Sequence, residues 1–129
     1  MDHRIADIRR RVAQSGGATE NDVDAVDDIL EAEGASAELL ILRGQLIQLV
    51  AEDRPEELEE ALECFREAIS IDPTSAEAHE EIAHFLDGVA EDPAEAARFF
   101  RKAIELGAGA SAEEGLREVL GQLAGEDVG

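Results

Sequence analysis

Residues 59–78 read EEALECFREAISIDPTSAEA, and this stretch decides the fold. Small and apolar residues recur at helical spacing, at Ala61, Phe65, Ala68 and Ile69, so they form one face of an α-helix. Proline at position 73 disfavours helix in the residue before it and ends the helix there. Ser75 then begins a second helix, because serine is a preferred N-cap residue. The stretch predicts two helices joined by a tight turn, with the first packed through its Ala and Phe residues.

The same pattern returns in residues 94–114, AEAARFFRKAIELGAGASAEE. Here the small, aromatic and branched positions fall 35 residues after those of the first stretch, at Ala96, Phe100, Ala103 and Ile104. The triplet Ser-Ala-Glu occurs three times, beginning at residues 36, 75 and 111, and each copy starts a predicted helix. The chain is therefore built from repeated helix pairs. We expect Phe65, Ala68, Phe100 and Ala103 to be buried.

Caps and breaks along the chain predict seven helices and no strand. Thr19 with Asp22 three residues later is one such N-terminal signal, and Asp92-Pro93 is another. The predicted helices are 2–15, 20–33, 36–51, 55–71, 75–89, 93–106 and 111–124, followed by a loose tail at 125–129. Because every link is short, consecutive helices should pack antiparallel within one domain, 1–129.

This organisation resembles the tetratricopeptide repeat (TPR) family, whose units of about 34 residues are helix–turn–helix pairs. The resemblance rests on the run from Ala61 to Pro73 and on Leu42-Arg43-Gly44, and it points to a small acidic TPR protein of bacterial type. It implies an all-α, right-handed α-solenoid of three antiparallel helix pairs and a cap. The predicted divisions are a degenerate pair 2–35, repeats 36–75 and 76–110, and a capping helix 111–124. The Trp and Tyr residues usual in the family are missing.

The resemblance also implies a site, because TPR proteins bind peptides or helices of other proteins in a concave groove lined by the first helix of each pair. The corresponding positions here are His3, Ala6, Arg10, Glu38, Ile41, Gln45, Gln48, Glu77, Glu80, His84 and Asp87. Some members hold a partner's terminal carboxylate with Lys, Arg and Asn, but this chain has Ile41, Gln45, Glu80 and His84 at the matching positions. The mixed apolar and acidic groove favours a partner segment that is apolar with basic residues.

Charge limits the classes of partner. The chain carries 32 acidic and 11 basic residues, a formal net charge of −21, and the excess is spread along its length. Such a surface repels phosphate groups, which disfavours nucleic acid and anionic membranes as partners. It is also typical of salt-adapted proteins. No apolar run approaches the ~20 residues needed to span a bilayer, and Cys64 is the single cysteine, so we expect a cytoplasmic protein.

The candidate catalytic residues do not form a convincing motif. The segment HEEIAH, residues 79–84, places two histidines five apart, which separates them by about 140° around a helix of 3.6 residues per turn. His79 and His84 should therefore not hold one metal ion. Cys64 has Glu60, Glu63 and Glu67 nearby in sequence, and carboxylates raise a thiol pKa. We predict no enzyme activity, cofactor or metal.

The prediction is a protein–protein interaction module or adaptor. Two alternatives remain: a self-assembly unit that binds further copies of this chain, and an acidic chaperone of the TPR type.

Overall fold

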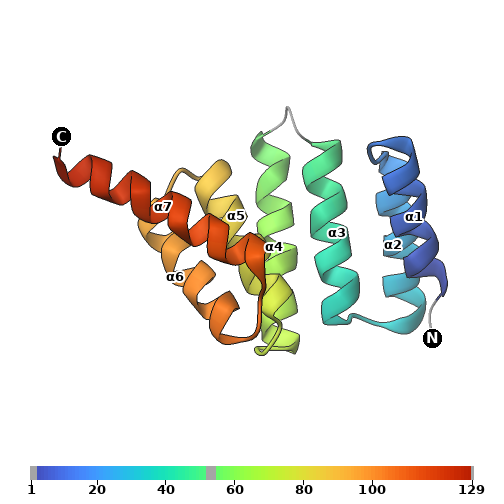
Figure 1. Ribbon diagram of the computed structural model, residues 1–129. Coiled ribbons are helices and arrows are strands. Elements are labelled where there is room, and N and C mark those ends of the chain that lie inside the picture. The colour runs from blue at the N-terminus through green and yellow to red at the C-terminus, as the bar shows by residue number, and fades with distance from the viewer. Residues whose placement is uncertain (1–2, 52–54, 129) are drawn as a thin grey trace. The chain divides into compact units, whose positions relative to one another are not determined.

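The computed structural model describes residues 3–51 and 55–128, and within them every regular element is an α-helix (Figure 1). The helices are α1 His3–Ser15, α2 Glu20–Glu33, α3 Ala37–Val50, α4 Pro55–Ile71, α5 Ala76–Gly88, α6 Pro93–Glu105 and α7 Ala110–Val128. The predicted all-α class is confirmed. Most predicted ends agree to within one residue, and residue 2 lies outside the described range.

The last helix differs from the prediction. Sequence patterns predicted an end at residue 124 and a loose tail from 125, but α7 continues to Val128. Only Gly129 of that tail lies outside the described residues. Extending a formed helix adds one backbone hydrogen bond per residue. Gly125 costs about 1 kcal/mol relative to alanine, and this single glycine does not end the helix.

The chain divides into two compact units, Met1–Cys64 and Phe65–Gly129, with the division inside α4. In the first unit, α2 packs against α3. Side chains from α1, α2 and α3 form one buried cluster, consisting of Ile5, Ile8, Val26, Ile29, Leu39, Leu42 and Leu46. These residues recur at helical spacing on each helix, so the core follows directly from the apolar stripes of the sequence.

Asp22 connects α1 with α2 in this first unit. Its side chain is 6% exposed. Oδ2 accepts a hydrogen bond from the Thr19 backbone N–H at 2.9 Å, which confirms the predicted capping arrangement. Oδ1 accepts from Arg11 Nη2 at 2.7 Å. The Thr19 N–H, together with the Arg11 guanidinium, holds the pKa of Asp22 below its ordinary value although burial works to raise it.

In the second unit, α5 packs on α6 and α6 packs on α7, as Figure 1 shows for these neighbouring helices. The links between them are short, so neighbours run antiparallel as predicted for TPR-like pairs. Phe65, Ala68, Phe100 and Ala103 are all fully buried, which confirms that prediction. The handedness of the whole array stays a prediction.

The Phe100 ring lies between α5 and α7. The His84 ring meets it edge-on, with centroids 5.0 Å apart and an interplanar angle of 81°. On the α7 side, the ring presses against Gly115, where a Cβ would stand 2.5 Å from Phe100 Cε1. Glycine at this position therefore allows α7 to approach α6 closely. Among the helices described, none combines the length and apolar character needed to cross a bilayer.

Candidate partner-binding surface

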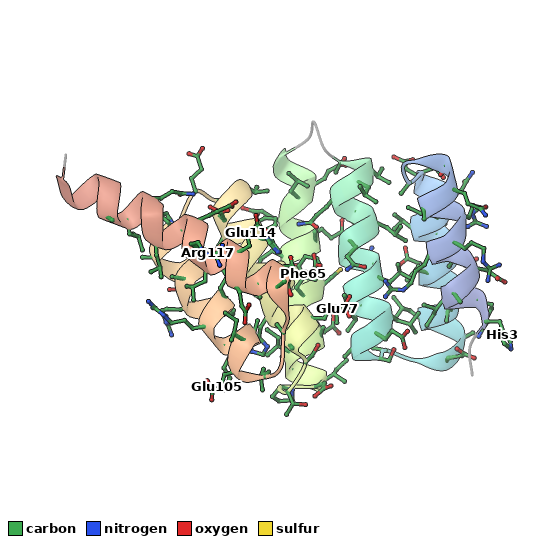
Figure 2. All side chains as sticks on the ribbon, in the orientation of Figure 1. His3, Phe65, Glu77, Glu105, Glu114 and Arg117 are labelled. Atoms are coloured by element: carbon green, nitrogen blue, oxygen red, sulfur yellow. The ribbon has the colours of Figure 1, made fainter. Side chains whose placement is uncertain are left out.

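The four polar positions predicted on α5 lie along one side of that helix. Glu77, Glu80, His84 and Asp87 recur at intervals of three and four residues, and Glu77 is labelled in Figure 2. Glu77 and His84 are exposed, whereas Glu80 and Asp87 are half-buried. The other side of the helix is buried, and its buried residues are Ala78, His79, Ile82, Ala83, Phe85 and Leu86. The α5 face, meaning Glu77, Glu80, His84 and Asp87, is thus a polar surface on a well-packed helix.

Two hydrogen bonds order this face. His84 Nε2 lies 3.2 Å from Glu80 Oε2, as expected for residues four apart on one helix. Gln122 Nε2, from α7, donates to Asp87 Oδ1 at 3.2 Å. Sequence reasoning missed Gln122, because nothing local in the sequence tells which side of α7 turns toward α5. With its ring against Phe100 and its Nε2 on Glu80, His84 is fixed in orientation.

The predicted positions in the first unit fall on α1 and α3. Arg10 is exposed and its Nη1 bonds to Asp7 at 3.1 Å. Glu38 is exposed and Gln48 is half-buried. Arg9 Nη1 donates to Gln45 Oε1 at 3.4 Å, which brings α1 and α3 together at this point. At these predicted positions, α1 and α3 therefore present mostly polar side chains.

Ile41 requires a correction. It was predicted to offer an apolar contact to a partner, but its side chain is 3% exposed. The reason is the composition of α3, AELLILRGQLIQLV, in which Leu39, Leu40, Ile41, Leu42, Leu46 and Ile47 are all buried. A helix that is apolar on nearly all sides is enclosed on nearly all sides. Ile41 is core, and a partner cannot reach it in this structure.

A pocket of about 300 Å³ lies among α2, α3 and the start of α4 in the first unit. Arg43 spans it: Nε bonds to Asp27 at 2.6 Å, Nη2 to Glu60 at 2.8 Å and Nη1 to the Cys64 sulfur at 3.2 Å. Burial works to lower the pKa of Arg43, but these hydrogen bonds outweigh it, so the pKa is raised and the guanidinium stays charged. The sequence showed carboxylates near Cys64, and the structure adds a cation, because the Arg43 guanidinium donates to the Cys64 sulfur.

The two histidines of HEEIAH diverge, as their spacing predicted. His79 is buried, with Nδ1 2.8 Å from the Ser75 carbonyl oxygen and its ring 6.1 Å from that of Phe99. His84 instead contacts Glu80 and Phe100. Within residues 3–51 and 55–128, no three His, Cys, Asp or Glu side chains are grouped so as to hold a metal ion.

Comparison with known proteins identifies the repeat. Residues 56–87 match the family model described as TPR repeat. The matched residues cover α4 and α5, which are the second helix of the predicted repeat 36–75 and the first helix of the predicted repeat 76–110. A search of curated proteins gives no match. TPR repeats in general mediate protein–protein interaction and are non-catalytic. The chain therefore contains a match to a TPR repeat at residues 56–87, which agrees with the resemblance noted in its sequence.

Proposed function

We propose that this chain is an interaction module that binds a peptide or helix of another protein through the exposed polar face of α5; the predicted positions on α1 and α3 stay predictions. The observation that carries the proposal is the α5 face, where three carboxylates and one imidazole share one side of a helix inside the matched repeat. Since the face is acidic, the partner segment carries Arg or Lys, and apolar residues beside them.

The spacing of the carboxylates indicates what such a segment looks like. Glu80 and Asp87 are seven residues apart, which is two turns or about 10 Å along the helix. A partner helix lying along α5 repeats its own side chains with the same rise. Basic residues seven apart on the partner therefore reach Glu80 and Asp87 together.

Glu80 should contribute most to this recognition. Its side chain is 21% exposed and is held by His84, so its orientation is already set before a partner arrives. A partly buried charge is screened by salt less than an exposed one. Glu77, at the first turn of α5, is exposed and should mainly steer the approach of a basic segment.

The test uses a synthetic helical peptide of about 14 residues, with Leu on one face and two Arg residues seven apart, and a copy with Gln in place of Arg. Binding is measured by fluorescence anisotropy for the native chain, for Glu80→Arg and for Glu67→Arg. Glu67 is an exposed residue of α4, so the second variant makes the same change of charge away from the α5 face.

We expect Glu80→Arg to weaken binding of the Arg peptide at least tenfold, which corresponds to about 1.4 kcal/mol, and Glu67→Arg to change it less than twofold. The Gln peptide should bind weakly to all three proteins. Equal affinities of Glu80→Arg and Glu67→Arg, with both folded by circular dichroism, would remove the α5 face as the site.

A further inference from the structure

A second pocket, of about 380 Å³, lies on the unit of residues 65–129, and its lining carries more positive than negative charges. It is lined by Arg98, Phe99, Arg101, Lys102 and Glu105 of α6 and by His79 of α5. Three of the 11 basic residues of a chain with 32 acidic ones thus stand within five positions of each other. Glu105, labelled in Figure 2, is the last residue of α6. On a protein of net charge −21, this cluster of cations makes the electrostatic potential locally positive.

The cations of this pocket are available to a ligand. Arg98 Nη1 bonds to Glu95 at 3.0 Å, but 73% of the Arg98 side chain is exposed. Lys102 Nζ lies 3.7 Å from Glu105, with 47% of the Lys102 side chain exposed. Exposed pairs within one helix are weak, so an incoming carboxylate can compete with them. Arg101 is exposed as well.

The floor of the pocket is aromatic and has one buried polar group. Phe99 is half-buried, and its ring lies against that of His79, which is 6% exposed. His79 Nδ1 faces the Ser75 carbonyl oxygen at 2.8 Å, and because a carbonyl only accepts, Nδ1 carries the proton. In the neutral ring, Nε2 is then an acceptor. His79 is one of the residues that line the pocket.

We propose that this pocket binds an acidic segment of another protein, with its carboxylates on the three cations and an apolar side chain against Phe99. Arginine donates two parallel hydrogen bonds to a carboxylate, which fixes the ligand's direction as well as its charge. The proposal goes beyond the α5 face, which selects basic segments. Its test is independent, because the two sites involve different residues and opposite ligand charges.

An acidic protein segment fits better than nucleic acid. A polyphosphate backbone extends past the pocket and meets the negative surface that surrounds it, whereas a segment of a few residues places its charges within the cluster. The apolar floor also favours a side chain over a bare phosphate. The chain is thereby equipped to hold a partner with both acidic and basic segments.

The probe is a fluorescein-labelled peptide, Glu-Glu-Leu-Glu-Glu-Leu, with a Gln-for-Glu copy as the matched control. Binding is measured at about 50 mM salt, where charge is weakly screened, to the native chain, to Arg101→Glu and to Arg117→Glu. Arg117, labelled in Figure 2, is an exposed residue of α7 outside the pocket, so both variants change net charge equally. We expect Arg101→Glu to weaken binding at least tenfold and Arg117→Glu less than twofold.

A gain of affinity provides a second, stricter test. Glu105 is the sole carboxylate among the described residues that line the pocket, so Glu105→Gln should tighten binding about threefold or more. Because His79 lines the pocket, nitrogen-15 spectra of its ring should show the Nε2 signal shifting when the peptide is added. An Nε2 signal that does not move would overturn the role of His79 and with it the location of the ligand.

Other results would overturn the proposal outright. Equal weakening by Arg101→Glu and Arg117→Glu would mean that the peptide responds to net charge alone. Equal binding of the Gln peptide would exclude carboxylate recognition. If inorganic tripolyphosphate bound more tightly than the peptide, the site would be one for phosphate. If sedimentation showed a dimer that Arg101→Glu dissociates, the pocket would belong to an interface between copies of this chain.

Discussion

Replacing Gly115 with alanine tests the packing of α7 on α6. A Cβ at this position would stand 2.5 Å from Phe100 Cε1 and 3.1 Å from Cε2, and nearer still to Cζ, whereas ordinary contact begins at 3.4 Å. The ring would have to withdraw by about 1 Å. Phe100 is fully buried and the His84 ring meets it from α5, so a shift of the ring displaces neighbouring side chains.

The magnitude follows from two opposing effects. Overpacking a close-packed site costs about 1–3 kcal/mol, and this site belongs at the upper end because the obstructing atoms are those of a rigid buried ring. Alanine is a better helix former than glycine by about 1 kcal/mol. We therefore expect Gly115→Ala to lower the free energy of unfolding by about 2 kcal/mol, and the melting temperature by roughly 5–10 °C.

The assay is urea and thermal denaturation followed by circular dichroism, with Gly121→Ala as control. Gly121 lies in the same helix, and a Cβ added there would have no atom within 4 Å, so that substitution should stabilise by up to about 1 kcal/mol. Opposite signs for the same chemical change isolate the contact with Phe100. Combining Gly115→Ala with Phe100→Leu, which replaces the ring by a smaller side chain, should cost less than the sum of the two changes. A Gly115→Ala protein at least as stable as the native chain would refute this reasoning.

Two further predictions concern charge. Because the folded-state pKa of Asp22 is below its ordinary value of 3.8, its ionised form contributes stability above pH 3.8, and this contribution is lost as the pH falls through the folded-state pKa. Asp22→Asn should therefore lower the free energy of unfolding by about 1.5–3 kcal/mol at pH 7, the range for hydrogen bonds to charged groups. In urea titrations, the difference in stability between this variant and the native chain should shrink below pH 3.8. A difference that stays constant with pH would contradict the assignment. The repulsion among the charges of a chain with net charge −21 should weaken when the Debye length falls from ~10 Å at 0.1 M salt to ~3 Å at 1 M. Calorimetry should therefore give a higher melting temperature in molar salt. A lower melting temperature would contradict this prediction.

The sequence by itself determined where the helices begin and, except for α7, where they end, because those signals are local. Ser36 and Ser75 bond to the backbone three residues on, and Asp92 does the same before Pro93. The Ala and Phe spacing of residues 59–78 likewise marked which side of each helix is buried. The pairing of Glu80 with His84 was predictable for the same reason, since residues four apart on a helix are always neighbours.

Tertiary structure decided the features that depend on which helix faces meet. Asp87 and Gln122 are 35 residues apart, and no spacing rule brings them together. Gly115 has the sequence context of an ordinary helix glycine, and only the fold places the Phe100 ring against it. Ile41 was predicted to lie in the groove because the family pattern gives that position on the helix. Its burial depends on the neighbouring side chains that enclose an apolar helix. The basic residues of α6 are visible in the sequence, but the buried His79 that lines the same pocket comes from another helix. The sequence could not show this, because side-chain contacts between helices are fixed by packing geometry and not by local spacing.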